Sequence, residues 1–250
     1  GGPAYYIKNG LKNKYLAGFF AVTCIVALGI VGIMVQSNSV VESLKTSVKL
    51  PSTITIIGLI AFVGIVLTGG MDRIAKFTEK VVPVMAFSYV FGCLVIIVMF
   101  SNKLLPAVGL IFEGAFTPQA IGGGVLGITL RDTIRYGLAR GLFSNEAGMG
   151  STPHSHAVAH TDHPAEQGFT AMIGVFISTF LICLSTIIIN IVSGSYNINI
   201  PATEMAKSAT LMTQNAFIKG FSSFGGIFLP LSLTFFSLTT IVGWYFFAES

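Results

Sequence analysis

Charged residues are scarce in this chain of 250 residues. Asp, Glu, Lys and Arg together make up 10% of the sequence, whereas a soluble domain carries roughly 25%. The few charges lie in short polar intervals between long apolar segments, and the mean hydropathy is +0.80. This composition is typical of a protein whose main solvent is lipid, so we expect an all-α membrane protein.

Cysteine is rare, and its placement excludes two classes of site. All three cysteines, Cys24, Cys93 and Cys183, lie within apolar segments, where a free cysteine behaves as a small hydrophobe. We therefore expect neither a disulfide framework nor a thiolate metal site. The net charge of +4 comes from Lys and Arg that flank the apolar segments, and no basic stripe with interleaved aromatics is present. Membrane lipid is thus an expected partner, and nucleic acid is not.

Motifs of catalysis and of metal binding are missing as well. Four histidines follow one another closely: His154, His156, His160 and His163. They lack the HExxH signature and, apart from Asp162, supporting carboxylates, so a helix end that carries histidines is favoured over a zinc site. Ser144 has no evident general base. We predict that the chain is not an enzyme, with an intramembrane hydrolase or an ion channel as the alternative.

Five apolar segments are long enough to cross a membrane. They cover residues 15–35, 53–69, 82–100, 169–192 and 224–247. The 21 residues of the first segment, at about 1.5 Å each, span a hydrocarbon core about 30 Å thick. Lys8, Lys12 and Lys14 precede it, which places that interval on the cytoplasmic side under the positive-inside rule.

A sixth crossing is predicted between the third and fourth segments. The interval 101–168 is too polar for an ordinary span and too apolar for a solvated loop, and the sidedness of the flanking lysines supports one more crossing. We place it at 121–159, as two half helices separated by an unwound joint within GLFSNEAGMGSTPHSHA, residues 141–157. A helix interrupted at membrane depth usually marks a binding site.

Small and polar residues predict the local structure of this joint. Glycines loosen the backbone, and Pro153 suits the first turn of the second half helix, which Ser151 or Thr152 could cap. We expect the carboxylate of Glu146 to cap amides that the joint frees. A short surface helix is expected further on, at 203–217, after Pro201.

The segment RYGLARGLFSNEAGMGSTPHSHAVAHTDHPAEQG, residues 135–168, closely resembles the signature of the alanine or glycine:cation symporter family. These are sodium-coupled amino-acid transporters of bacteria and archaea with a LeuT-type fold. GGPAYYIKNGL at the start, QSNSV after the first span, GGMDRIAKFTEKVVPVMA between the second and third spans and GWYFF near the end are similar to the same family. The likeness therefore covers most of the chain.

The resemblance implies two inverted repeats of five helices, with the first helix of each repeat broken around a shared midplane site. Residues 1–250 would form a single membrane domain, in which 15–35, 53–69 and 82–100 belong to the first repeat. The broken helix at 121–159 and the segments 169–192 and 224–247 would belong to the second. Two helices of the fold would be missing at each end, so we expect a fragment that does not transport by itself.

The resemblance also implies the activity: symport of a small neutral amino acid, alanine or glycine, with a sodium ion, by alternating access in the plasma (inner) membrane of a prokaryote. No cofactor is implied besides the coupling ion, and nothing in the sequence requires more than a monomer. The substrate-binding residues would come from the joint, from the last span and from the end of the first span. They are Phe143, Ser144, Asn145, Glu146, Ala147, Gly148, Thr240, Trp244 and Gln36.

Three of the residues outside the joint have specific expected roles. The hydroxyls of Thr239 and Thr240 suit a sodium ion, which prefers hard oxygen ligands. Trp244 could limit the size of the pocket, or it could be an aromatic residue at the membrane interface. Gln36 could lie near the substrate, or it could be a polar residue at a helix end.

Overall fold

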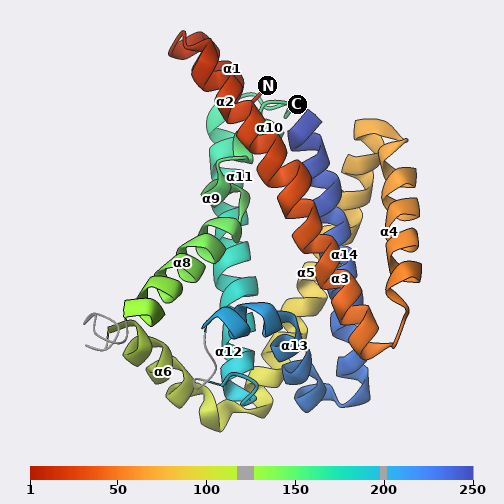
Figure 1. The fold of residues 1–250 in the computed structure, drawn as a ribbon, viewed down its shortest axis with the longest axis vertical. Coiled ribbons are helices and arrows are strands. Elements are labelled where there is room, and N and C mark those ends of the chain that lie inside the picture. Colours follow the sequence, from red (N-terminus) through yellow and green to blue (C-terminus); the bar gives the residue numbers. More distant parts are fainter. Residues whose placement is uncertain (117–126, 198–201, 250) are drawn as a thin grey trace. The chain divides into compact units, whose positions relative to one another are not determined.

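The computed structural model describes the backbone of residues 1–116, 127–197 and 202–249 (Figure 1). Side chains are described in the same ranges except at 70–75, 115–116, 127–133, 202–203 and 205–207. All elements in the described ranges are helices. Four helical stretches there are long and apolar enough to cross a membrane: Lys14–Ser47, Lys76–Met99, Pro164–Val192 and Ser223–Glu249. The predicted all-α membrane class agrees with this architecture.

The helices form two compact units. Unit 1 consists of Gly1–Ala86, Asn145–Phe176 and Pro230–Ser250, and unit 2 consists of Phe87–Ser144 and Ile177–Leu229. Unit 1 therefore contains most of the predicted joint, together with the part of the last span that carries Thr239, Thr240 and Trp244.

Unit 1 begins with a short helix that packs against a long one. Helix α1 (Pro3–Gly10) contacts α2 (Lys14–Cys24), and the Asn13 side chain caps α2 by accepting hydrogen bonds from the amides of Tyr15 and Leu16, at 3.1 and 3.0 Å. Helix α2 continues as a π-helical segment, η1 (Ile25–Gly32), and then as α3 (Ile33–Ser47).

The first helical stretch is thus longer than the predicted segment 15–35. The apolar run ends at Val35, but the helix continues to Ser47 because α3 is amphipathic: Val40 and Ser43 are fully buried while its other positions are more exposed. In this part of the helix, one buried face indicates helical structure, whereas uniform hydrophobicity indicates it before Val35. Helix α3 packs against the apolar helix α4 (Ser52–Leu67), which occupies the predicted segment 53–69.

The other predicted segments also lie within longer helices. Helix α5 (Gly70–Met99) contains most of 82–100, and α14 (Ser223–Glu249) contains 224–247. The segment 169–192 lies within a stretch formed by α11 (Pro164–Phe176), the π-helical segment η3 (Ile177–Cys183) and α12 (Leu184–Val192).

The predicted crossing at 121–159 contains three helices in its described part. They are α8 (Gly127–Phe143), α9 (Glu146–Met149) and α10 (Thr152–His156). Residues 121–126 lie outside the described residues. An interruption at Ser144 and Asn145 separates α8 from α9, where the joint was predicted.

Unit 2 is held together by α12 and α13. Helix α12 contacts α6 (Leu104–Phe116), which follows the 3-10 turn η2 (Ser101–Lys103), and it also contacts α13 (Ala202–Phe221). Helix α13 contains the predicted surface helix 203–217, but Ala216 and Phe217 are fully buried. The helix is therefore longer than predicted and packs one face into unit 2.

Candidate functional site

The joint is built from a side-chain cap and a reversal of the backbone. Asn145 has an extended conformation, and its Oδ1 accepts a hydrogen bond from the Gly148 amide at 2.8 Å, so it is the N-cap of α9. Gly150 closes α9 with φ of 73°. The Gly150 amide donates to the Ala147 carbonyl at 3.2 Å and the Ser151 amide to the Glu146 carbonyl at 3.0 Å, the two bonds of a Schellman motif.

The carboxylate of Glu146 is bound by two side chains. Its Oε1 accepts a hydrogen bond from Nε1 of Trp244 at 3.0 Å, and its Oε2 accepts one from the Ser151 hydroxyl. The expectation that Glu146 caps freed amides of the joint is therefore wrong, because Asn145 supplies the cap and the carboxylate turns to α14. Ser151, one of the two predicted caps, occupies the N-cap position of α10, but its side chain forms no capping hydrogen bond and its hydroxyl donates to Glu146.

Trp244 lies against a glycine of the first helical stretch. Its side chain is 3% exposed, and a Cβ added at Gly32 would overlap the indole ring at Cζ3 and lie 2.7 Å from Cε3. Gly32 thus lets the indole approach the backbone of η1 while its N–H reaches Glu146. The indole is therefore buried within unit 1.

Gln36 lies on the same surface of contact between two helices. Its Oε1 accepts a hydrogen bond from the hydroxyl of Ser237, which is 1% exposed. Gln36 pairs with Ser237, Gly32 with Trp244, and Gly29 lies against Ala248. Because the residue numbers of these partners decrease along the first helical stretch while they increase along α14, α14 runs antiparallel to η1 and α3. Gln36 is therefore bound inside unit 1 and is not a solvated residue at a helix end.

Thr239 and Thr240 donate hydrogen bonds within their own helix. The Thr239 hydroxyl lies 3.1 Å from the Phe235 carbonyl oxygen and 2.9 Å from that of Phe236, and the Thr240 hydroxyl lies 2.8 Å from that of Phe236. A hydroxyl that donates in this way keeps its oxygen lone pairs for an acceptor role. In the part of the chain that the structure describes, neither hydroxyl is hydrogen-bonded to Glu146 or Gln36, the polar side chains of the site that contact α14.

The predicted site residues do not all belong to one unit. Asn145, Glu146, Ala147 and Gly148 share unit 1 with Gln36 and Trp244, whereas Phe143 and Ser144 belong to unit 2. Three residues that contribute to the site were missed by sequence reasoning: Gly32, Ser151 as a partner of Glu146, and Ser237. Ser237 and Trp244 are two turns apart on one helix, and this spacing could have predicted that they share a face.

Comparisons with known proteins assign the chain to a family. The sequence model of the sodium:alanine symporter family matches residues 1–250. The chain belongs to the sodium:alanine symporter family. Its members among the relatives below are transporters rather than enzymes, so the hydrolase alternative is excluded.

Three curated relatives illustrate the range of this symporter family. An uncharacterized transporter of Bacillus subtilis, YflA, is 43% identical over 242 residues, which is 97% of this chain and 50% of the relative. The sodium/alanine symporter AgcS of Methanococcus maripaludis is 34% identical over 254 residues, which is 100% of this chain and 54% of the relative. The probable sodium/glutamine symporter GlnT of Bacillus subtilis is 36% identical over 252 residues, with 100% and 50% covered. The chain therefore spans about half the length of the curated relatives it matches.

Proposed function

We propose that this chain is one half of a sodium-coupled symporter for a small neutral amino acid, alanine or glycine. The observation that carries the proposal is the interrupted helix, where Asn145 caps the joint and Trp244 holds the carboxylate of Glu146. Unwound backbone in a membrane-spanning stretch is tolerated where it lines a cavity, and its amides and carbonyls suit the carboxylate and the ammonium group of an amino acid.

The size of the substrate is set in this proposal by Trp244. The indole lies one turn beyond Thr240, and its position is fixed by Gly32 on one side and by Glu146 on another. A large, immobile ring beside the joint leaves room for a short side chain and excludes a long one. This favours alanine, the substrate in the name of AgcS, over glutamine, the substrate in the name of GlnT. In this proposal Phe143 is the lid or wall against the small side chain, and Ser144 and Gln36 are further substrate-binding residues.

Sodium has two sources of hard oxygen ligands in this chain. The hydroxyls of Thr239 and Thr240 donate to carbonyls and keep lone pairs for a cation. Glu146 supplies a negative charge within the joint itself. Among the described residues, no cationic side chain is paired with this carboxylate. A carboxylate at membrane depth that lacks a basic partner favours a cation as its companion.

The mechanism that follows is alternating access. Sodium binding orders the unwound backbone, the amino acid completes the site, and the two repeats of a LeuT-type fold rock to expose the site to the cytoplasm. The bacterial and archaeal sources of the relatives support a prokaryotic plasma membrane as the location. The relatives are about twice as long as this chain. The active transporter would therefore contain further helices, about as many as this chain has.

The experiment is uptake of labelled alanine by proteoliposomes that contain the complete transporter, with and without an inward sodium gradient. We expect saturable uptake that depends on sodium and that unlabelled glycine reduces, whereas glutamine does not. D-alanine serves as the test of enantiomer preference. Uptake that ignores the sodium gradient would overturn the coupling, and a flux that does not saturate would favour the channel.

A further inference from the structure

His154 of α10 is an ionisable side chain that is buried beside the joint. It is 5% exposed, whereas His156 on the same short helix is only partly buried. Histidine is fully buried less often than an apolar residue, and a buried polar side chain is normally hydrogen-bonded. The contacts of His154 therefore indicate what holds it inside unit 1.

The imidazole of His154 is hydrogen-bonded to the backbone of Ser151. Its Nδ1 atom lies 3.0 Å from the Ser151 carbonyl oxygen. A carbonyl oxygen only accepts hydrogen bonds, so Nδ1 carries the proton and donates. The backbone amide of His154 donates to the same oxygen, also at 3.0 Å. The two donors occupy both lone pairs of this carbonyl and fix the orientation of Ser151.

Ser151 binds Glu146 with its other polar groups. Its amide donates to the Glu146 carbonyl oxygen at 3.0 Å, and its hydroxyl donates to the carboxylate oxygen Oε2. The other carboxylate oxygen, Oε1, accepts the indole N–H of Trp244 at 3.0 Å. Ser151 and Trp244 are 2% and 3% exposed, so these hydrogen bonds are shielded from water, which strengthens them. A continuous hydrogen-bonded series thus leads from His154 to Trp244.

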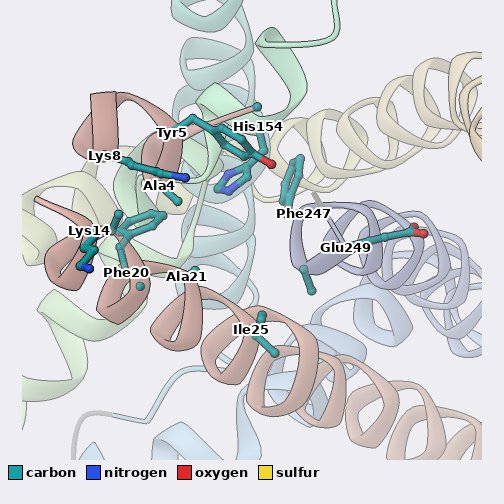
Figure 2. A pocket seen from close by; sticks show the side chains of 14 residues that line it. Ala4, Tyr5, Lys8, Lys14, Phe20, Ala21, Ile25, His154, Phe247 and Glu249 are labelled. Atoms are coloured by element: carbon teal, nitrogen blue, oxygen red, sulfur yellow. The ribbon is translucent and has the colours of Figure 1, made fainter. Parts of the chain in front are cut away.

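The ring of His154 is held by segments of unit 1 outside α10. It stacks on Phe20 of α2 with 6.3 Å between the centroids, and it lies 5.7 Å from the ring of Phe247 of α14. Figure 2 shows the imidazole between these two rings. A Cβ at Gly2, where φ is 106°, would lie 2.7 Å from Cδ2 of the imidazole, so glycine lets the backbone approach the ring closely. Packing outside the joint therefore sets the position of Nδ1.

The contacts of Glu146 and His154 lead to the same helix. Trp244 and Phe247 are three residues apart on α14, which places them on one face of it. Trp244 binds Glu146, which precedes Ser151, and Phe247 packs on His154, which follows it. Helix α14 therefore holds the joint at two points. The contact at Trp244 alone leaves the carboxylate free to rotate, whereas the second contact at His154 restrains it through Ser151.

We propose that His154 is a positioning residue of the amino-acid site. Through Ser151 it orients the carboxylate of Glu146, and through this carboxylate it orients the indole of Trp244. The imidazole itself does not touch the amino acid or the sodium ion. This inference rests on the proposed function, in which Glu146 and Trp244 belong to the substrate site. When the Nδ1 donor is lost, the carboxylate and the indole are held less tightly, and alanine binds more weakly.

The test compares two substitutions of His154 in sodium-driven alanine uptake by proteoliposomes that contain the complete transporter. His154→Phe keeps an aromatic ring and loses the donor, whereas His154→Asn loses the ring and keeps a donor at about the position of Nδ1. We expect His154→Phe to raise KM for alanine about fivefold, the effect of one hydrogen bond, with the maximal rate unchanged. His154→Asn should restore KM most of the way to the wild-type value. A residue that acts by packing alone gives the reverse order.

His156→Phe is the matched control, because it makes the same change at a less buried position of α10, and it should keep the wild-type KM. Ser151→Ala removes the hydroxyl that connects His154 with the carboxylate of Glu146. It should raise KM as His154→Phe does, and the double variant should be no worse than either single one. An unchanged KM in His154→Phe, a lower KM in His154→Phe than in His154→Asn, or additive effects would overturn the proposal.

Fluorine NMR of the transporter labelled with fluorotryptophan separates this inference from the proposed function. The signal of Trp244, assigned by its absence in Trp244→Phe, reports on the surroundings of the indole without any transport. We expect His154→Phe to shift or broaden this signal and His154→Asn to leave it in place. A wild type that takes up no alanine with sodium refutes the proposed function, whereas identical signals in the wild type and His154→Phe refute the positioning role.

Discussion

At the scale of single residues, the position of Trp244 depends on two neighbours that are far away in the sequence. Glu146 accepts the indole N–H at 3.0 Å, and Gly32 leaves the space that the ring occupies. Hydrogen bonding and packing thus fix the same ring by different means, and each can be removed separately.

Trp244→Phe removes the hydrogen bond and keeps an aromatic ring beside Gly32. Leaving one oxygen of a part-buried carboxylate without its donor costs about 1–3 kcal/mol, so the joint loses its link to α14. We expect sodium-dependent alanine uptake to fall about tenfold, as measured in proteoliposomes. Tyr245→Phe, a change at the adjacent and more exposed position, should leave uptake unchanged. Equal rates in Trp244→Phe and the wild type would remove the hydrogen bond from the account.

Gly32→Ala tests the packing. The added methyl group meets the indole ring, and overpacking of this kind costs about 1–3 kcal/mol. We expect a lower apparent Tm of the transporter in detergent. Gly58→Ala in α4 is the control, because a Cβ there has no neighbour within 4 Å, and it should not lower the Tm. A Tm of Gly32→Ala that matched this control would show that the indole lies elsewhere.

At the scale of the elements, hydrophobicity predicted where the long helices lie but not how far they extend. The segment 15–35 stops at the last apolar residue, whereas the helix continues to Ser47 because Val40 and Ser43 are buried against other helices. The amphipathic part of a helix has a mixed composition that resembles a loop, and only its packing shows that it is helical. The π-helical segment η1 has no signal of this kind, since Ile25–Gly32 is uniformly apolar apart from its glycines.

The joint shows the same division between local and distant causes. Asn145 and the glycines predicted an interruption, because their conformational preferences are local. The partner of Glu146 could not be read in this way, since Trp244 follows 98 residues later. Local reasoning therefore assigned the carboxylate to the nearest amides, and the structure corrects this with a side chain from another helix.

The connection between α13 and α14 provides a test in unit 2. A Cβ at Gly225 would overlap the backbone carbonyl of Phe217, whereas one at Gly226 would lie 3.7 Å from the side chain of Ile218. Backbone cannot move aside as a flexible side chain does, so Gly225→Ala should lower stability by about 1–3 kcal/mol or more. Gly226→Ala should have little effect. Thermal unfolding of the two variants in detergent measures the difference, and equal values would contradict this packing.

At the scale of the whole molecule, the chain matches the family over its full length, but it spans only about half the length of its relatives. The family could be predicted from the sequence because SNEAG and its neighbours are specific. The central claim is that the joint from Asn145 to Ser151 forms one wall of the amino-acid site.

Sodium-dependent alanine uptake by the complete transporter with Asn145→Leu tests this claim most directly. Leucine cannot accept the hydrogen bond of the Gly148 amide, so the joint loses its cap, whereas Asn145→Ser keeps an acceptor and serves as the matched control. The account predicts that Asn145→Leu abolishes uptake with normal membrane insertion, while Asn145→Ser retains it. Unchanged uptake in Asn145→Leu would contradict the account.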